Sequence, residues 1–525
     1  MNVDALAPVL DEFVPIVLKA THTPGVTLAV MDLKGNQLAA GYGLSNLAAR
    51  TPMDAGAVMK GASMSKLIGG IAALQLVEHR VLDLHKPITD YLDLDVRNPC
   101  GPRAISAFDL LTHQSGLATD CAVGSLRPPP PLAEHLESSY REPHRSAYGG
   151  VPARWTAPVG TRYQYSNLGL ATVGHLVAEL NGEHDSYADY VEHTIFAPLG
   201  MTSTSVPPVQ NSQYVSPKIL ARLVTGYARY GGWWVPYPAV HVAGYPASNI
   251  LTTALDYTRL LLALLNGGRH DGKAILSSRA VRHLLTPHAS GVSPGEPPGL
   301  WTGLSVEMRN LRRRDFWFGH GGAYRYGWWG ESRAYPHLGF AITIVANAWD
   351  AVREFNPPRR IAPGIIADFV ARWTMGGDAR RPATVNAVSW SDGAAYAMGV
   401  LFAERLRGVL GVQEDLTAID TAAMLAGARC LEDELPTRAL SREHFDAGVS
   451  AINAIATPTP QEIRAVLAHP EAHVPPAVLD LYALAFGASR AEYPVPMRFW
   501  ADRVEESGQT EHLTAIPDHD PRGPL

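Results

Sequence analysis

Hydrophobic and polar positions at the start of the chain follow first a helical period and then a strand period. An opening amphipathic helix is predicted by apolar residues spaced three or four apart, at Leu6, Leu10, Phe13 and Val17. Two apolar runs, residues 26–31 and 37–41, follow it and are separated by Lys34-Gly35-Asn36. Because this tripeptide is typical of a tight turn, the two runs are predicted to form a β-hairpin.

A longer apolar stretch, from Ser63 to Leu76, has the length and continuity of a buried helix. It contains Gly69-Gly70, which costs helix propensity but lets a helix pack closely against a neighbour. Near residue 320 the pattern returns to strands, with the aromatic run 316–319 and the β-branched run 340–347. Strands at both ends, with helices between and beyond them, predict an antiparallel sheet flanked by helices. This is an α+β fold, and an all-helical subdomain is expected to hold Tyr165.

Residues 376–525 have helical patterns but contain no constellation of polar residues that indicates catalysis. They begin with Gly376-Gly377-Asp378, which is typical of a linker. We therefore expect two domains, a catalytic domain over residues 1–375 and a C-terminal helical domain over residues 376–525. The role of the second domain is open between a dimerisation module, which would make the protein a homodimer, and a lid over the active site.

Composition and charge exclude several classes of function. The chain has 525 residues, of which 46% are hydrophobic and 18% charged, as in a globular protein with at least two cores. Its net charge of −6 gives no basic surface for nucleic acid. The N-terminus lacks the pattern of a secretory signal, and no apolar run approaches the ~18 residues that span a membrane. We expect a cytoplasmic protein that binds neither nucleic acid nor membranes.

Three short motifs at wide spacing indicate a chemistry. Ser63-Met64-Ser65-Lys66 begins the predicted helix, and the triplets Tyr165-Ser166-Asn167 and His320-Gly321-Gly322 follow. Residues three apart share one face of a helix, so the Lys66 amine lies within reach of the Ser63 hydroxyl and can draw its proton. A serine nucleophile with a lysine partner is the first interpretation.

The motifs and the segments between them resemble the penicillin-recognising serine hydrolases, in the branch that contains class C β-lactamases, family VIII carboxylesterases and related acyltransferases. The resemblance runs from about residue 10 to residue 373. Besides the three motifs, it rests on four segments in the family's order, which are residues 110–117, 158–167, 198–201 and 251–257. It implies a β-lactamase/transpeptidase-like fold for the catalytic domain.

The resemblance also implies a role for each motif residue. Ser63 attacks the substrate carbonyl, Lys66 lowers the cost of deprotonating Ser63, and Tyr165 passes a proton to the leaving group. Asn167 bonds Lys66 or a substrate carbonyl. The expected catalytic residues are therefore Ser63, Lys66, Tyr165, Asn167 and His320.

An oxyanion hole is implied in the same way. It consists of the backbone N–H groups of Ser63 and of Ala323, the residue directly after the third motif. Gly321 and Gly322 are assigned to substrate binding, because a strand without side chains can approach a substrate closely. The two halves of the site would thus come from segments about 260 residues apart.

The first position of the third motif bears on the identity of the substrate. Family members that hydrolyse antibiotics or build cell wall have a lysine there, whose charge meets a substrate carboxylate, whereas this chain has His320, largely neutral at pH 7. This departure favours a carboxylic ester over a β-lactam. Aromatic residues near the expected cleft favour an apolar or aromatic acyl group, and those assigned to substrate binding are Trp233, Trp234, Tyr324 and Trp328.

Alternative activities on the same fold stay open, namely acyl transfer or transesterification, amide or peptide hydrolysis and, less favoured, β-lactam hydrolysis. A non-enzymatic alternative is a binding or sensor module that is acylated at Ser63 and then stalls. Neither a cofactor nor a metal is expected. The three cysteines are too few and too scattered, and Pro470 interrupts the helix that would align His469 with His473.

Overall fold

The structure is a computed structural model that describes residues 1–21, 23–118, 124–125, 128–141, 155–209, 215–230, 233–237, 241–291, 300–311, 314–324, 327–350 and 362–377. The predicted C-terminal domain, residues 376–525, lies outside the described residues except for its first two. The dimerisation module, the lid and the homodimer therefore stay predictions. The last described helix, α12 (Ala362–Gly377), runs two residues past the predicted boundary at residue 375.

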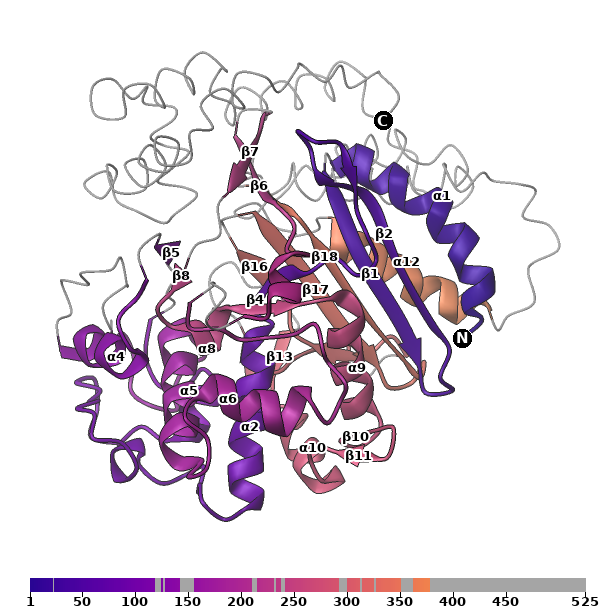
Figure 1. The fold of residues 1–525 in the computed structure, drawn as a ribbon. Helices are drawn as coiled ribbons and strands as arrows, with labels where there is room; N and C mark the ends of the chain where they lie inside the picture. The colour runs from indigo at the N-terminus through magenta and orange to yellow at the C-terminus, as the bar shows by residue number, and fades with distance from the viewer. Residues whose placement is uncertain are drawn as a thin grey trace, which may run out of the picture.

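Within the described residues, the main sheet has ten strands, and its pairs are antiparallel. The strand order is β12-β13-β14-β15-β17-β18-β1-β2-β3, with β16 paired to β17. Early and late parts of the chain meet where β1 lies between β18 and β2 (Figure 1). The strands are β1 (Gly25–Asp32), β2 (Gln37–Asn46), β3 (Thr51–Pro52), β12 (Ala289–Gly291), β13 (Leu300–Thr302), β14 (Glu307–Arg309), β15 (Trp317–Gly319), β16 (Gly322–Tyr324), β17 (Trp328–Tyr335) and β18 (Phe340–Ala346). The predicted hairpin and both predicted late strands are confirmed.

The turn between β1 and β2 follows directly from its sequence. The Asp32 carboxylate accepts hydrogen bonds from the backbone N–H groups of Lys34 at 2.9 Å and Asn36 at 3.0 Å. Gly35 has a φ of +85°, which a glycine adopts without the strain that a side chain would cause. The short loop therefore fixes the register of the hairpin around Asp32.

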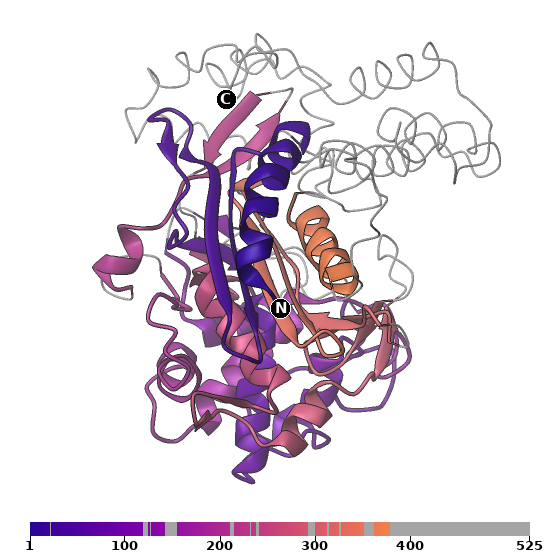
Figure 2. The ribbon, with the colours of Figure 1, turned by 90° about the vertical axis from the view of Figure 1, so that its right-hand side faces the viewer.

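Helices cover both faces of the main sheet (Figures 1 and 2). On one face, α1 (Val3–Thr21) packs beside α12, and Phe13 stacks on Phe369 with ring centroids 3.8 Å apart. The predicted amphipathic helix is confirmed, because its four apolar positions are fully buried. On the other face lies α9 (Ala254–Leu265), which packs on β1 and β18. None of the helices in the described part of the chain combines the length and the hydropathy that a bilayer span requires.

Between α2 (Ser65–Glu78) and α9 the chain forms a mainly helical region that contains the second motif. Its helices are η1 (Ile88–Asp90), α3 (Ala107–Leu111), α4 (Leu132–Arg141), α5 (Asn167–Leu180), α6 (Tyr187–Val191), the π-helix η2 (Glu192–Phe196), α7 (Pro217–Leu220) and α8 (Tyr245–Ser248). The region also contains short strands, so it is not wholly helical as predicted. β5 (Gly124–Ser125) pairs with β8 (His241–Val242), and β6 (Gly226–Tyr230) pairs with β7 (Trp233–Tyr237) and with β19 (Ala348–Asp350). Two further pairs are β4 (Met59–Ala62) with β9 (Ile250–Thr252), and β10 (Arg269–His270) with β11 (Lys273–Ala274), which precedes α10 (Ser278–Leu284).

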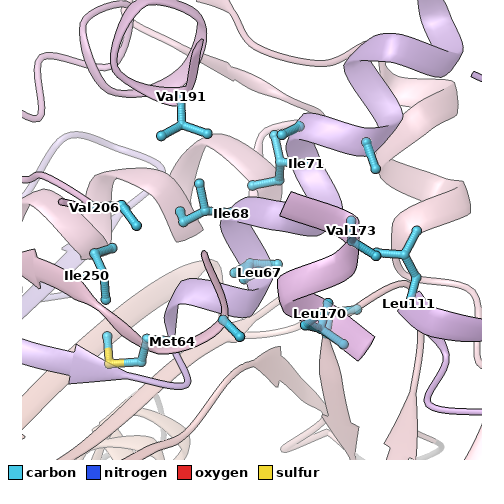
Figure 3. Packing of buried hydrophobic residues seen from close by; sticks show 14 of the residues in the cluster. Met64, Leu67, Ile68, Ile71, Leu111, Leu170, Val173, Val191, Val206 and Ile250 are labelled. Carbon is cyan, nitrogen blue, oxygen red and sulfur yellow. The ribbon is translucent and has the colours of Figure 1, made fainter. Parts of the chain in front are cut away.

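The central helix of the larger hydrophobic core is α2. Its residues from Ser65 to Leu76 are buried all round, as expected for a helix that is apolar on every face. Leu67, Ile68 and Ile71 lie in one cluster with Leu170 and Val173 of α5 (Figure 3). This packing holds the helix with the first motif against the helix with the second.

Two adjacent glycines of α2 give a matched test of this packing. A Cβ at Gly70 would lie 2.5 Å from the carbonyl oxygen of Leu304, so we expect Gly70→Ala to lower the free energy of unfolding by ~1–3 kcal/mol. A Cβ at Gly69 would meet only the Tyr187 hydroxyl at 3.7 Å, and Gly69→Ala should leave stability unchanged or raise it by up to ~1 kcal/mol through helix propensity.

Urea unfolding of the full chain, followed by circular dichroism, measures both variants. Equal stability of the two alanine variants would contradict the close packing of α2 against the segment that holds Leu304.

Candidate active site

The first motif lies where β4 passes into α2. Ala62 has a φ of +49°, in the left-handed region that is costly for a residue with a Cβ and that persists where surrounding structure enforces it. Ser63 and Met64 form a turn, and the helix begins at Ser65, two residues later than predicted. The Lys66 N–H donates to the Ser63 carbonyl at 3.0 Å. Because this bond closes the first turn, Ser63 and Lys66 still share one face.

Buried hydrogen bonds hold this turn. The Ser65 hydroxyl donates to the Ala62 carbonyl at 2.7 Å and accepts from the Ile250 N–H at 2.9 Å, which joins the turn to β9. The Tyr257 hydroxyl of α9 donates to the Met64 carbonyl at 2.8 Å. The Ser65 hydroxyl is thus hydrogen-bonded to two backbone groups, whereas Ser63, in the turn, is half-buried.

Lys66 joins the first two motifs. Its side chain is fully buried, and Nζ lies 3.0 Å from Ser63 Oγ, 2.6 Å from Asn167 Oδ1 and 2.9 Å from the Ala247 carbonyl. An ammonium can donate to all three atoms. A neutral amine in the same place can donate to Asn167 and Ala247 and accept the proton of Ser63. One geometry therefore serves both states that a proton transfer between Ser63 and Lys66 requires.

The second motif is presented by the start of α5. Ser166 caps this helix, because its hydroxyl accepts from the Gly169 N–H at 3.1 Å, and Asn167 is the first helical residue. Of the two predicted roles of Asn167, the structure has the bond to Lys66. Tyr165 directly precedes the cap and is half-buried, with its ring centroid 4.8 Å from Lys66 Nζ. The four residues Ser63, Lys66, Tyr165 and Asn167 are thus brought together.

His113 is a site residue that the sequence analysis missed. Its Nδ1 accepts from the Ser166 N–H at 3.1 Å, and its ring lies 4.6 Å from that of Tyr165. Burial, followed by the charges of Lys66 and His320, lowers the pKa of His113 well below its usual range. The imidazole is therefore neutral at pH 7, with its proton on Nε2. The only available signal was its position inside the family-like segment 110–117.

The third motif lies at the end of β15. His320 is buried, and its Nδ1 lies 2.6 Å from the Gly321 carbonyl, which makes Nδ1–H the donor. Ser332 of β17 fixes the backbone, since its hydroxyl donates to the His320 carbonyl at 2.7 Å and accepts from the His320 N–H at 3.2 Å. The ring centroids of His320 and Tyr165 are 6.4 Å apart.

Glu307 of β14 is a second residue without a sequence prediction. Its Oε2 accepts from the Gly321 N–H at 3.4 Å, and its Oε1 lies 3.9 Å from His320 Nδ1. The carboxylate is about three-quarters buried. A negative group therefore stands beside the histidine of the third motif.

The glycines of the third motif behave differently from one another. A Cβ at Gly322 would overlap the carbonyl oxygen of Gly61, so β16 lies directly against the strand that leads to Ser63. A Cβ at Gly321 would have its nearest neighbour 3.8 Å away. The close approach at Gly322 is thus to the chain's own backbone. β16, which contains the exposed Ala323, thus contacts β4, the strand before Ser63, and the oxyanion hole of Ser63 and Ala323 stays a prediction.

The aromatic residues assigned to substrate binding are mostly packed. Tyr324 and Trp328 are 2% and 1% exposed and lie in the larger core, with their ring centroids 5.0 and 5.5 Å from the buried Lys60 Nζ. Trp234 is half-buried against the core under α1 and α12. The side chain of Trp233 lies outside what the structure describes. Substrate binding by these residues stays a prediction, and burial favours a packing role for Tyr324, Trp328 and Trp234.

Comparison with known families decides the relationship that the motifs suggested. The family described as Beta-lactamase matches residues 10–362, a span that contains all three motifs. The chain belongs to the beta-lactamase family. Its membership makes it a serine hydrolase- or acyltransferase-type enzyme, and the β-lactamase/transpeptidase-like fold is confirmed.

Individual relatives of this beta-lactamase-family chain are distant. It is 28% identical to Protein Rv1367c of Mycobacterium tuberculosis over 327 residues, 54% of this chain and 75% of that protein. It is 27% identical to Acyltransferase calJ of Penicillium decumbens over 311 residues, 52% of this chain and 68% of that protein. A solved D-amino acid amidase from Ochrobactrum anthropi SV3, complexed with L-phenylalanine, matches with a TM-score of 0.55 and 20% identity over 71% of this chain and 100% of that one. These likenesses support the fold, and they do not fix a substrate.

The lowered pKa of His113 predicts a pH dependence of stability. The unfolded chain protonates this histidine below about pH 6.5, whereas the folded chain keeps it neutral. The unfolded state therefore binds more protons in acid, and His113 costs the folded state up to ~1.4 kcal/mol per pH unit below that pH. We expect His113→Gln, whose amide oxygen can still accept from Ser166, to lose less stability than the wild type between pH 7.5 and pH 5.

Thermal unfolding of both proteins across this range checks the difference. His193→Gln is the control, because His193 is largely exposed and its pKa is raised by hydrogen bonding and by the charge of Asp189. Parallel stability profiles for wild type and His113→Gln would show that His113 is protonated in the folded state.

Proposed function

We propose that the protein hydrolyses carboxylic esters with apolar or aromatic groups through an acyl-enzyme on Ser63. The observation that supports this most directly is the set of contacts at Lys66, whose Nζ lies within hydrogen-bonding distance of the Ser63 hydroxyl and of Asn167. A nucleophile with a base in direct contact, held by a third group, is the arrangement that covalent catalysis needs.

The reaction divides into two steps. Ser63 Oγ attacks the acyl carbonyl and gives its proton to Lys66 Nζ, and the leaving alkoxide departs with a proton delivered by Tyr165. Water then attacks the acyl-enzyme and gives a proton to the Tyr165 phenolate, Lys66 returns its proton to Ser63 Oγ, and the carboxylic acid is released. In both steps the carbonyl oxygen becomes negative, and the N–H groups of Ser63 and Ala323 are the proposed donors to it.

The surroundings of His320 support a neutral acyl donor. Its Nδ1–H is turned to the Gly321 carbonyl, and the Glu307 carboxylate lies 3.9 Å away. A substrate carboxylate beside these groups would meet a negative charge where other family members offer a lysine. An ester without a charged group avoids that repulsion.

Acyl transfer is the second candidate activity. It uses the same acyl-enzyme and differs only in whether water or another nucleophile reaches it. The similarity to Acyltransferase calJ, 27% identical over 52% of this chain, favours it over amide hydrolysis. Assays with added alcohols or amines distinguish transfer from hydrolysis, because a transferase yields a new ester or amide.

Ser63 gives the first test of the mechanism. We expect Ser63→Ala to abolish labelling by a fluorophosphonate and to lower turnover of p-nitrophenyl esters by at least ~10³-fold, since the nucleophile is lost. The matched control is Ser65→Ala, which removes a neighbouring hydroxyl that bonds only backbone atoms, so labelling should persist at reduced stability. Full ester turnover by Ser63→Ala would refute the mechanism. Stoichiometric labelling of the wild type without turnover would support the sensor module instead.

His320 and Glu307 give a test of the substrate class. We expect His320→Lys to lower KM for a carboxylate-bearing ester by at least roughly 5-fold, about 1 kcal/mol, while turnover of neutral esters falls. Glu307→Gln should shift KM in the same direction without adding a cation, and His320→Gln is the neutral control. Efficient hydrolysis of nitrocefin by the wild type would contradict the preference for neutral esters.

A further inference from the structure

Three side chains just beyond α5 form a cluster that has no part in the proposed reaction. His184 lies in the loop after α5, Asp189 in α6, and His193 in η2. His184 Nδ1 is 3.0 Å from Asp189 Oδ2, and His193 Nδ1 is 3.1 Å from Asp189 Oδ1. All three donor atoms lie within 4.8 Å of one another. From this geometry we propose a binding site for a divalent transition-metal ion such as Zn²⁺, with these three residues as ligands.

The donor set selects the class of ion. Two imidazole nitrogens and one carboxylate oxygen suit Zn²⁺ and its neighbours in the first transition row, whereas Mg²⁺ and Ca²⁺ prefer oxygen ligands. Bonds of 2.0–2.1 Å in a tetrahedron place neighbouring ligand atoms about 3.4 Å apart. His184 Nδ1 and His193 Nδ1 face different oxygens of the Asp189 carboxylate, at 3.0 and 3.1 Å, so the carboxylate must rotate to offer one oxygen to an ion that both nitrogens bind. Three protein ligands leave the fourth position for water.

A comparison within the chain argues that Asp189 is not simply a helix cap. In α3, the Asp109 carboxylate accepts from the N–H and the hydroxyl of Ser106, which completes a capping box. Asp189 occupies the same position relative to Ser186, whose hydroxyl accepts from the Asp189 N–H at 3.1 Å. Its carboxylate is directed to the two imidazoles instead. The Asp189 carboxylate, which could complete a capping box, thus contacts the two histidines instead.

The local backbone holds the ligands in place. The N–H of His184 donates to Asn181 Oδ1 at 2.7 Å, and the Asn181 amide donates back to carbonyls at the end of α5. His193 lies in the π-helix η2, where the Ala197 N–H bonds the Glu192 carbonyl, a form of helix frequent at functional sites. His184 and Asp189 are 19% and 38% exposed and His193 is 61% exposed, so the cluster is open to solvent, and His193 must turn its Nδ1 from the Asp189 backbone carbonyl, 2.9 Å away, to bind an ion.

The metal site is separate from the reacting groups and would act on stability. Asn167 begins α5 and His184 follows its far end, so the helix of 14 residues, about 21 Å long, lies between them. Tyr187 of α6 packs edge-on against Tyr245 of α8, with ring centroids 6.1 Å apart, and α8 also provides the Ala247 carbonyl that bonds Lys66. An ion that ties α6 to η2 and to the loop after α5 thus steadies the helices behind Lys66.

Metal titration of the full chain tests the site. After removal of metals with EDTA, we expect Zn²⁺ to bind with a stoichiometry of one in calorimetry at pH 7.5 and to raise the melting temperature. Co²⁺ should give the visible absorption of a tetrahedral site. His184→Gln, Asp189→Asn and His193→Gln should each weaken binding by at least ~10-fold and lose the zinc-dependent rise in melting temperature. The matched control is His175→Gln, which removes a histidine whose Nδ1 lies 3.6 Å from Glu179 Oε1, a pair that offers an ion only two ligand atoms.

Saturable binding that disappears in the three ligand variants and persists in His175→Gln supports the proposal. Two results overturn it: no saturable binding of Zn²⁺ by the folded wild type, or binding that the three variants retain, which would assign the ion to other residues. His193→Gln keeps the experiment decisive if the other variants fail to fold, because its side chain is mostly in solvent.

Discussion

A buried amine determines how the active site is assembled. Lys66 is fully buried, and an unpaired charge at such a position costs several kcal/mol. Its Nζ is bonded to atoms of three segments far apart in the sequence, namely Ser63 before α2, Asn167 at the start of α5 and Ala247 in α8. The chain can therefore bury this lysine only when all three segments meet. Formation of the catalytic site is for this reason part of the folding of the core, rather than an addition to its surface.

The segments around Lys66 can meet because their backbones approach one another closely at glycines. Gly174 lets α5 lie against Pro246 of α8, because a Cβ there would overlap the proline ring. Gly322 lets β16 lie against Gly61, and so joins the main sheet to the strand before Ser63. The left-handed backbone of Ala62 then turns the chain between that strand and α2. These glycines position the reacting groups through the backbone.

Much of the fold and the central residues of the site could be predicted, because each rests on local sequence. The amphipathic spacing of Leu6 to Val17 and the turn at Gly35 specify their elements within a few residues. The contacts of His113 with Tyr165 and of Glu307 with His320 could not be predicted, since they join residues more than ten positions apart through the tertiary fold.

The start of α2 was placed two residues early because no sequence pattern reveals the φ of Ala62. Tyr324 and Trp328 were assigned to the cleft by their proximity to the third motif, although proximity does not tell which face of β16 and β17 a side chain lies on. The cluster of His184, Asp189 and His193 has no sequence prediction, because one of its residues lies in a loop and no single helical spacing relates all three.

The two buried bases of the site differ in their hydrogen-bond partners. Burial keeps His113 neutral, whereas Lys66 Nζ has three oxygen atoms within 3.0 Å that can accept from the ammonium formed when Ser63 gives up its proton. Positive charge can therefore gather beside Ser63 and Tyr165, where acyl transfer creates negative charge on oxygen. At the third motif, the Glu307 carboxylate lies 3.9 Å from His320 Nδ1 and adds a negative charge there. Because the ammonium forms at Lys66 beside the reacting atoms and a carboxylate lies beside His320, the site is better suited to stabilising a transition state than to holding an anionic substrate in the ground state.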